Sequence, residues 1–154
     1  MRILLVDDNP DAVRVIENFL KALDHIVFSY TDAREALLWL KDVRPEIIVA
    51  DLDMPGMNGF EFIRRLRAYS SFSSVPAICV TGTEATDQEI YAAGFAAILR
   101  KPVTLADMLE AIDSVRALSA PSSATEQIVT HDEPTASANQ QSQVEQSSQA
   151  EPQQ

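Results

Sequence analysis

The sequence predicts an α/β fold of the (βα)₅ type, in which helices cover both faces of a five-stranded parallel sheet. Short apolar runs alternate with amphipathic segments of helical period through the first 119 residues. The runs Ile3–Val6 and Ile47–Ala50 are continuously apolar, which is typical of strands buried on both faces. Strands that alternate with helices pair in parallel, because each helix carries the chain back to the same end of the sheet.

Five short segments are expected to form the strands. In chain order they are Arg2–Val6, Ile26–Tyr30, Ile47–Ala50, Ala77–Thr81 and Ala97–Arg100. A doubly wound sheet of this size favours the flavodoxin-like strand order 2-1-3-4-5.

The first two helices have recognisable starts. Pro10 suits the first turn of the first helix, where apolar residues recur at helical spacing over 13–20. Asp32 precedes the second helix, and Glu35 stands three residues later, as in a capping box.

The remaining three helices follow the third, fourth and fifth strands. The third runs from about Phe60 to Tyr69. The fourth begins at Thr86, has Glu89 three residues later and ends at Gly94. The last begins at Thr104. Its expected buried face consists of Leu105, Met108, Leu109, Ile112 and Val115.

The composition changes near Ser119, which divides the chain into an expected domain, residues 1–119, and a tail, residues 120–154. The tail has no aromatic residue, no Lys and no Arg, and it contains eight Gln, six Ser, three Pro and five acids. Such a segment buries too little apolar surface to offset its chain entropy. We therefore expect a disordered, acidic Gln/Ser-rich tail and no separate output domain.

Charge and hydropathy exclude several classes of function. The chain has 23 acidic and 12 basic residues, and its net charge of −11 argues against direct binding to nucleic acid or an anionic membrane. No segment has the length of a membrane span, and the apolar run near the N-terminus is too short for a signal peptide, so a cytoplasmic location is expected. The single cysteine, Cys79, lies in an apolar run and is expected to be a buried core residue.

Polar side chains follow four of the five expected strands. They are Asp7 and Asp8, then Asp51 and Asp53, then Thr81, then Lys101. The carboxyl ends of parallel strands lie along one edge of the sheet, where ligands bind in open α/β folds. We therefore expect acids, a hydroxyl and an amine to converge there.

Three of these acids, Asp7, Asp8 and Asp51, predict a metal site. Crowded carboxylates either raise their pKa values or bind a cation, and oxygen ligands with room for water and phosphate suit Mg²⁺. A purely structural interpretation, in which residues 7–10 only cap the first helix, requires one such side chain rather than three acids.

Asp51, at the end of a central strand, is the candidate nucleophile. A carboxylate can form an aspartyl phosphate if the charge of the phosphoryl group is neutralised. The metal and Lys101 would supply that charge, Thr81 can donate its hydroxyl to a phosphoryl oxygen, and Gly82 leaves space beside it. Taken singly, Lys101 and Thr81 would be ordinary helix-flanking and strand residues.

Four motifs in this order resemble the receiver domain of bacterial two-component response regulators. They are residues 3–9 (ILLVDDN), 48–59 (IVADLDMPGMNG), 80–82 (VTG) and 100–102 (RKP), and the resemblance covers residues 1 to about 119. It implies that Asp51 is the phosphoacceptor, Thr81 the switch hydroxyl and Lys101 the phosphate-contacting lysine. It also implies a cis Lys101-Pro102 peptide bond.

The resemblance further implies a Mg²⁺ site. Asp8 would bind the ion directly, Asp7 mainly through water, and Asp53 through its backbone carbonyl. One position departs from the family, which usually has Tyr or Phe three residues before the lysine; this chain has Ile98. Phosphate acceptance is expected to survive, whereas the aromatic readout of the family is in question.

The implied function is a signalling phosphoacceptor rather than an enzyme, with only self-phosphorylation and self-dephosphorylation. Its phosphoryl donor would be a sensor histidine kinase or a histidine phosphotransfer protein. A downstream protein target, or a second copy, would dock on the surface of the fourth helix, fifth strand and fifth helix. Neither His25 nor His131 has the placement of a phosphorelay histidine.

Two alternatives remain open from the residues. The motif Asp51-Leu52-Asp53 resembles the Asp-x-Asp of haloacid-dehalogenase-type phosphatases, but these place it after their first strand. The other alternative is an interaction module on the receiver fold that works without phosphorylation. Such modules normally lack an acid or the lysine, and this chain has them all.

Overall fold

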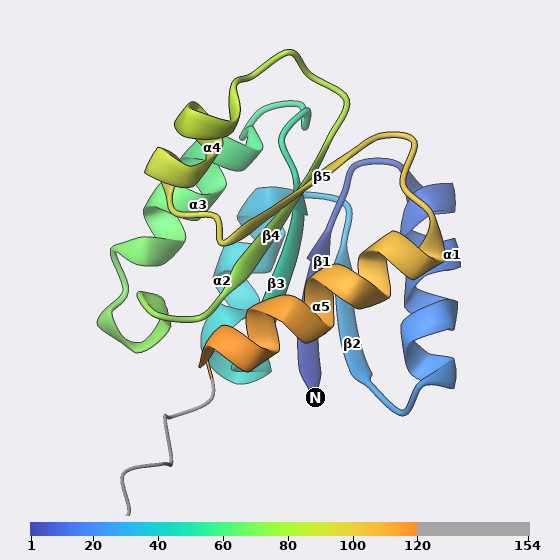
Figure 1. The fold of residues 1–154 in the computed structure, drawn as a ribbon. Coiled ribbons are helices and arrows are strands. Elements are labelled where there is room, and N and C mark those ends of the chain that lie inside the picture. Colours follow the sequence, from blue (N-terminus) through green and yellow to red (C-terminus); the bar gives the residue numbers. More distant parts are fainter. Residues whose placement is uncertain (120–154) are drawn as a thin grey trace, which may run out of the picture. The chain divides into compact units, whose positions relative to one another are not determined.

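The computed structural model describes residues 1–119, which form a five-stranded sheet with helices on both faces (Figure 1). The strands are β1 (Arg2–Val6), β2 (Ile26–Tyr30), β3 (Ile47–Asp51), β4 (Ala77–Thr81) and β5 (Ala97–Arg100). Neighbouring strands pair in parallel in the order β2-β1-β3-β4-β5. The predicted fold class and strand order are confirmed.

The helices connect these strands in the predicted alternation. They are α1 (Pro10–Ala22), α2 (Ala33–Val43), α3 (Gly59–Arg67), the short 3₁₀ helix η1 (Ser70–Phe72), α4 (Asp87–Ala93) and α5 (Leu105–Ser119). In Figure 1, α2, α3 and α4 lie on one side of the sheet, and α1 and α5 lie on the other.

Each strand contributes alternate side chains to two apolar layers. In β1, Leu4 and Val6 pack under α2 and α3, whereas Ile3 and Leu5 pack under α1 and α5. All four side chains are at most 1% exposed. This period of two is the reason that strands covered on both faces are apolar at every position.

The helix starts follow the predicted capping residues, but at α2 only the Asp32 half of the predicted capping box forms, because the Glu35 side chain makes no bond back to the Asp32 N–H. Asn9 caps α1 and Asp32 caps α2 by accepting hydrogen bonds from backbone N–H groups of the first turn. At α4 the capping box is complete, because Thr86 accepts from the Glu89 N–H while the Glu89 carboxylate accepts from the Thr86 N–H. Gly94 then ends α4 in the left-handed conformation, at φ +111°.

Three further local predictions differ from the structure. Strand β3 extends one residue further than expected, because Asp51 still pairs with Val80 of β4. The third helix ends at Arg67 rather than Tyr69, and η1 follows because Phe72 turns into the apolar layer, where it is 6% exposed. Leu105, predicted to be buried, is the first residue of α5 and is 39% exposed.

Cys79 is fully buried in β4, as predicted, and burial raises the pKa of its thiol to about 12. None of the described helices is both long enough and apolar enough to cross a membrane. The predicted disordered tail concerns residues 120–154, which lie outside the described residues, and the domain boundary near residue 119 stays a prediction.

Candidate functional site

The carboxyl edge of the sheet collects the buried polar side chains of the described part of the chain. Asp7, Asp51 and Thr81 are 3%, 2% and 0% exposed, and no other polar or charged side chain in residues 1–119 is as well buried. They lie at the ends of β1, β3 and β4, which are neighbours in the sheet. The predicted convergence of these residues on one edge is therefore present.

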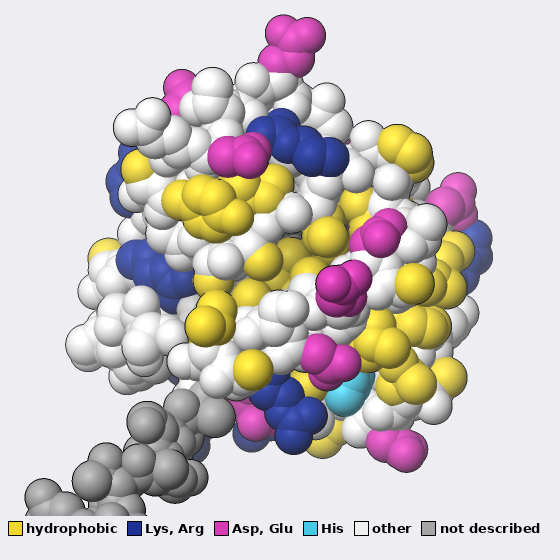
Figure 2. All heavy atoms as spheres, viewed as in Figure 1, with side chains coloured by type: hydrophobic (Ala, Val, Ile, Leu, Met, Phe, Trp, Pro, Cys, Tyr) yellow, Lys and Arg dark blue, Asp and Glu magenta, His cyan; other side chains and the backbone are white. Residues whose placement is uncertain are grey.

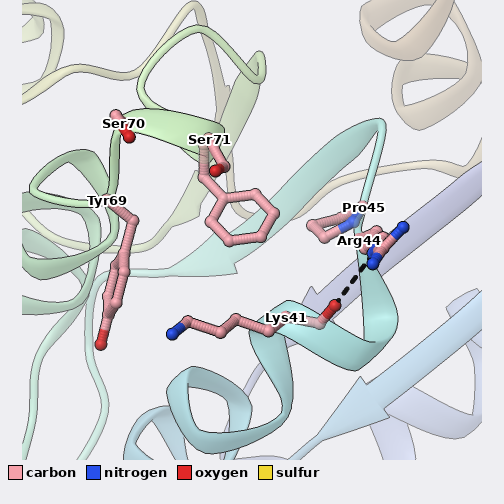
Figure 3. A pocket seen from close by; sticks show the side chains of 7 residues that line it. Lys41, Arg44, Pro45, Tyr69, Ser70 and Ser71 are labelled. Atoms are coloured by element: carbon pink, nitrogen blue, oxygen red, sulfur yellow. Dashed lines mark hydrogen bonds between the residues drawn. The ribbon is translucent and has the colours of Figure 1, made fainter.

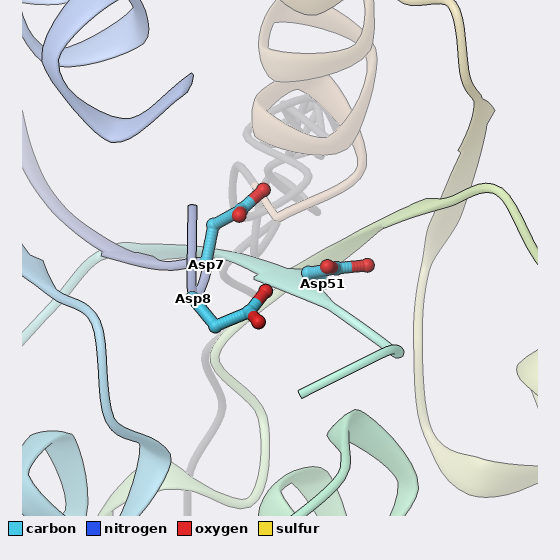
Figure 4. A group of neighbouring side chains, drawn as sticks. All are labelled: Asp7, Asp8 and Asp51. Carbon is cyan, nitrogen blue, oxygen red and sulfur yellow. The ribbon is translucent and has the colours of Figure 1, made fainter. Parts of the chain in front are cut away.

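Three carboxylates meet at this edge (Figure 4). Asp7 and Asp8 follow β1 and Asp51 ends β3, and ligand oxygens of all three lie within 4.8 Å of one another. Asp8 is exposed, whereas the other two are buried. Burial raises the pKa of Asp7, and the neighbouring Asp51 charge raises it further, although the Asn9 N–H and Lys101 act in the opposite direction.

Lys101 compensates part of this negative charge. Its Nζ lies 3.2 Å from Oδ2 of Asp51 and 3.5 Å from Oδ2 of Asp7. Partial burial alone would lower the pKa of Lys101, but the two carboxylates outweigh it and the pKa is raised. The Lys101-Pro102 peptide bond is cis, as the resemblance implied.

Backbone groups fix the orientation of the two buried acids. The Asn9 N–H donates to Oδ1 of Asp7 at 2.9 Å, and the Asp53 N–H donates to Oδ1 of Asp51 at 3.2 Å. The Asp53 side chain is exposed. Its role as a metal ligand through the backbone carbonyl stays a prediction.

A glycine sets the packing directly behind Asp51. A Cβ added to Gly59 would lie 2.3 Å from the Asp51 carbonyl oxygen and 2.7 Å from Cα of Leu52. Its N–H also donates to the Leu52 carbonyl at 3.0 Å. Only glycine fits this close approach of α3 to the end of β3, and the sequence analysis did not single it out. By contrast, a Cβ on Gly82 would make only ordinary contact with Lys101 at 3.9 Å.

The Thr81 hydroxyl is already engaged in hydrogen bonds. Oγ1 accepts from the Thr83 N–H at 3.0 Å and lies 2.9 Å from Oγ1 of Thr83. Thr83 therefore holds the hydroxyl that was predicted to contact a phosphoryl oxygen.

Arg100 is a second feature that the sequence analysis missed. Its guanidinium donates to the carbonyls of Thr83 and Ala85 and to the carboxylate of Asp87, at 2.6–2.7 Å. The sequence offered one signal, a cation at the last position of a strand directly before Lys101.

The donor set fits a hard divalent cation. The cluster offers three carboxylates from two adjacent strand ends, one of them exposed and therefore accessible. It contains no His or Cys, so its chemistry favours Mg²⁺ over softer transition metals. Burial raises the pKa of Asp7 and so disfavours its charged form, which a cation at this edge would stabilise.

A separate hollow of about 650 Å³ lies at the opposite edge of the sheet (Figure 3). Lys41, Arg44 and Pro45 line one side of it, and Tyr69, Ser70 and Ser71 line the other. Phe72 also belongs to the lining. These segments precede β3 and β4, so they are remote from the strand ends that carry the acids. The hollow has no acid in its lining, and it is not part of the carboxylate site.

Comparisons with known proteins agree with this geometry. Residues 3–113 match the family model described as the response regulator receiver domain. The chemotaxis protein CheY-3 of Vibrio cholerae is 32% identical over 121 residues, which cover 75% of this chain and 91% of that protein. The protein PilH of Pseudomonas aeruginosa is 29% identical over 118 residues, which cover 75% and 98%.

Solved structures lead to the same result. The structure of the chemotaxis response regulator CheY4 of Vibrio cholerae superimposes with a TM-score of 0.69 at 30% identity. The superposition covers 73% of this chain and 96% of that structure. The family match over residues 3–113 includes all five strands, so the chain belongs to this family in both sequence and fold.

Proposed function

We propose, from the premise that this chain belongs to the response regulator receiver domain family, that it is phosphorylated on Asp51 in a Mg²⁺-dependent reaction. The observation that carries this proposal is the placement of Asp51. It is buried beside the carboxylates of Asp7 and Asp8, and the Lys101 Nζ lies 3.2 Å from its Oδ2. A sensor histidine kinase or a histidine phosphotransfer protein would be the phosphoryl donor.

The transfer requires few groups. An Asp51 oxygen attacks phosphorus, the P–N bond of the donor phosphohistidine breaks, and its electron pair returns to the imidazole ring. Lys101, already beside Oδ2, would pair with a phosphoryl oxygen, and Thr81 would donate its hydroxyl to another. The Asp53 N–H holds the other carboxylate oxygen in place.

Mg²⁺ would be held by the carboxylates of Asp7, Asp8 and Asp51 and by the backbone carbonyl of Asp53. When bound, the ion supplies positive charge that neutralises phosphoryl oxygens and the acid cluster. The partial charge compensation by one lysine for two buried acids supports this requirement.

We further propose that the output surface lies on α4, β5 and α5. Figure 2 shows hydrophobic side chains gathered between α4 and α5, with acidic side chains along α5. The shallow hollow in this region includes Tyr91, Ile98 and Leu99. Ile98 is half-buried against the layer of α2 and α3, so it would offer a smaller shape change than an aromatic ring would. A downstream protein or a second copy would bind here.

Intact-mass measurement after incubation with acetyl phosphate and Mg²⁺ tests the assignment. The wild type should gain one phosphoryl group, the Asp51→Asn variant none, and the exposed control Asp42→Asn the same as the wild type. Equal labelling of the Asp51→Asn variant would refute Asp51 as the acceptor. Unlabelled wild type would favour the interaction module, and multiple turnover of a phosphomonoester would favour the phosphatase.

A further inference from the structure

Arg100 and Thr81 lie side by side on two adjacent strands, β5 and β4. They are register partners at the ends of β5 and β4, and the Lys101 N–H donates to the Thr81 carbonyl at 2.8 Å. Residues 100 and 101 are therefore adjacent cations with different partners. Lys101 reaches the acids, whereas the Arg100 side chain extends over the segment that follows Thr81.

One guanidinium holds that segment at three points. Nη1 of Arg100 donates to the Thr83 carbonyl at 2.7 Å, and Nη2 donates to the Ala85 carbonyl and to Oδ1 of Asp87, both at 2.6 Å. The side chains of Arg100 and Asp87 are 41% and 69% exposed, so the ion pair alone contributes little. The two carbonyl contacts are different, because a planar fork fixes the position of the loop backbone.

The same segment restrains the switch hydroxyl. The fully buried Thr81 accepts from the Thr83 N–H, and Thr83 in turn accepts from the Ala85 N–H at 3.4 Å. If the Thr81 hydroxyl turned toward a phosphoryl group, the Thr83 N–H would lose its acceptor unless the loop backbone moved with it. Arg100 resists that movement through the Thr83 carbonyl.

We propose that Arg100 is a positioning residue that holds the β4–α4 loop, residues 82–86, in the unphosphorylated arrangement and so opposes engagement of Thr81 with the phosphoryl group. The inference rests on the proposed phosphorylation of Asp51. It concerns the balance between two arrangements of the loop, since Arg100 pairs with Asp87 and not with the clustered acids Asp7, Asp8 and Asp51. Part of the free energy gained when Thr81 contacts the phosphoryl group is then spent on releasing the loop from Arg100.

Two variants separate this role from a simple effect of charge. Arg100→Gln removes the fork and its charge, whereas Arg100→Lys keeps the charge but cannot hold two carbonyls and a carboxylate with the same geometry. If Arg100 only attracted the anionic ligand, Arg100→Gln would bind the ligand more weakly and Arg100→Lys would resemble the wild type. If it holds the loop, both variants should bind more tightly.

The measurement is the affinity for beryllofluoride, a phosphoryl mimic, in saturating Mg²⁺, by calorimetry or NMR titration. We expect both variants to bind about threefold to tenfold more tightly, the effect of about one net hydrogen bond. Mg²⁺ affinity without beryllofluoride should not change, because Arg100 contacts no ligand of the metal. The matched control is Arg14→Gln, which removes an exposed arginine paired with Asp11 on α1 and should bind as the wild type does.

Amide hydrogen exchange of the metal-free protein provides a readout that does not depend on phosphorylation. The Thr83 and Ala85 amides should exchange faster in the Arg100→Lys variant, while those of β1 and β3 keep their protection. Unchanged loop exchange would overturn the inference, as would weaker or equal beryllofluoride affinity in both variants. Failure of the wild type itself to bind beryllofluoride would overturn the proposed function, and with it the regulatory role of Arg100.

Discussion

The two apolar layers and the carboxyl edge of the sheet differ in what they bury. In the layers, large side chains such as Phe62, Leu4 and Ile78 are fully buried without a polar atom to satisfy. At the edge, Asp7 and Asp51 are buried almost as deeply, although a carboxylate loses its hydration there. The layers therefore account for most of the stability, whereas the buried charges at the edge cost stability.

Hydrogen bonding makes the charged edge tolerable. No buried side-chain nitrogen or oxygen in residues 1–119 lacks a hydrogen-bond partner. Asp51 has Lys101 and the Asp53 N–H, and Asp7 has Lys101 and the Asn9 N–H. The residual excess of negative charge is the part that a cation would neutralise. Five changes test this difference between layers and edge, from the largest expected effect to the smallest.

Truncating the centre of a layer should have the largest effect on stability. Phe62 is fully buried on α3, so Phe62→Ala should lower the free energy of unfolding by about 3–5 kcal/mol in a urea titration. Leu38→Ala, on an α2 side chain that is 79% exposed, should change it by less than about 0.5 kcal/mol. Similar losses in the two variants would contradict the division into layer and surface.

The close contact of Gly59 on α3 with the end of β3 should affect stability almost as strongly. In Gly59→Ala, the new Cβ would collide with backbone atoms of Asp51 and Leu52, and we expect a loss of about 3 kcal/mol together with reduced labelling by acetyl phosphate. Gly82→Ala is the matched control for stability, because its Cβ meets only Lys101 at 3.9 Å. Equal losses of stability in the two glycine variants would show that α3 does not pack against the end of β3 as closely as the structure has it.

Metal binding should neutralise the excess negative charge at the carboxyl edge and so stabilise the folded protein. A ligand that binds only the folded state at 100 times its Kd adds about 2.7 kcal/mol of stability, so the melting temperature should rise with Mg²⁺. Asp8→Asn should abolish most of the rise. Asp113→Asn, at an exposed position on α5, should keep it. A rise of the same size in the Asp8 variant would exclude Asp8 as a ligand.

The pH dependence of stability should show that the charged form of Asp7 destabilises the metal-free protein. Burial raises the pKa of Asp7 above its ordinary 3.8, so the associated stability is fully present below pH 3.8 and is lost as the pH rises through the raised pKa. Asp7→Asn should therefore stabilise the metal-free protein at pH 7 and have little effect below pH 3.8, in urea titrations at the two pH values. Destabilisation at pH 7 would mean that the ion pair with Lys101 outweighs the cost of burial.

Removing the tail should have the smallest effect. Residues 120–154 contribute no aromatic side chain and no cation, so truncation after Ser119 should keep the melting temperature within about 1 °C and leave the labelling rate unchanged. Differential scanning calorimetry and a time course with acetyl phosphate provide these measurements. A decrease of several degrees would show that the tail contributes to the stability of residues 1–119.

Most of the fold could be predicted because its determinants are local. The apolar runs of β1 and β3, the cap at Asn9 with Pro10 and the capping box of α4 each depend on a few adjacent residues. The site residues followed from one topological fact, that parallel strands end at the same edge. The sequence predicted that Asp7, Asp51 and Thr81 lie close together because each one ends or directly follows a strand.

The sequence by itself determined the alternation of strands with helices and the residue types available at the carboxyl edge. The strand order was only favoured by the size of the sheet, and the structure confirms it. Only the tertiary structure decided that Asp7 is buried while Asp8 is exposed, that Gly59 has no room for a Cβ, and that Arg100 holds the loop after Thr81. Patterns of period two or 3.6 encode which face a residue occupies. Burial, close approach and hydrogen-bond partners depend on side chains that are distant in sequence, such as residues 7 and 101, and no local pattern records them.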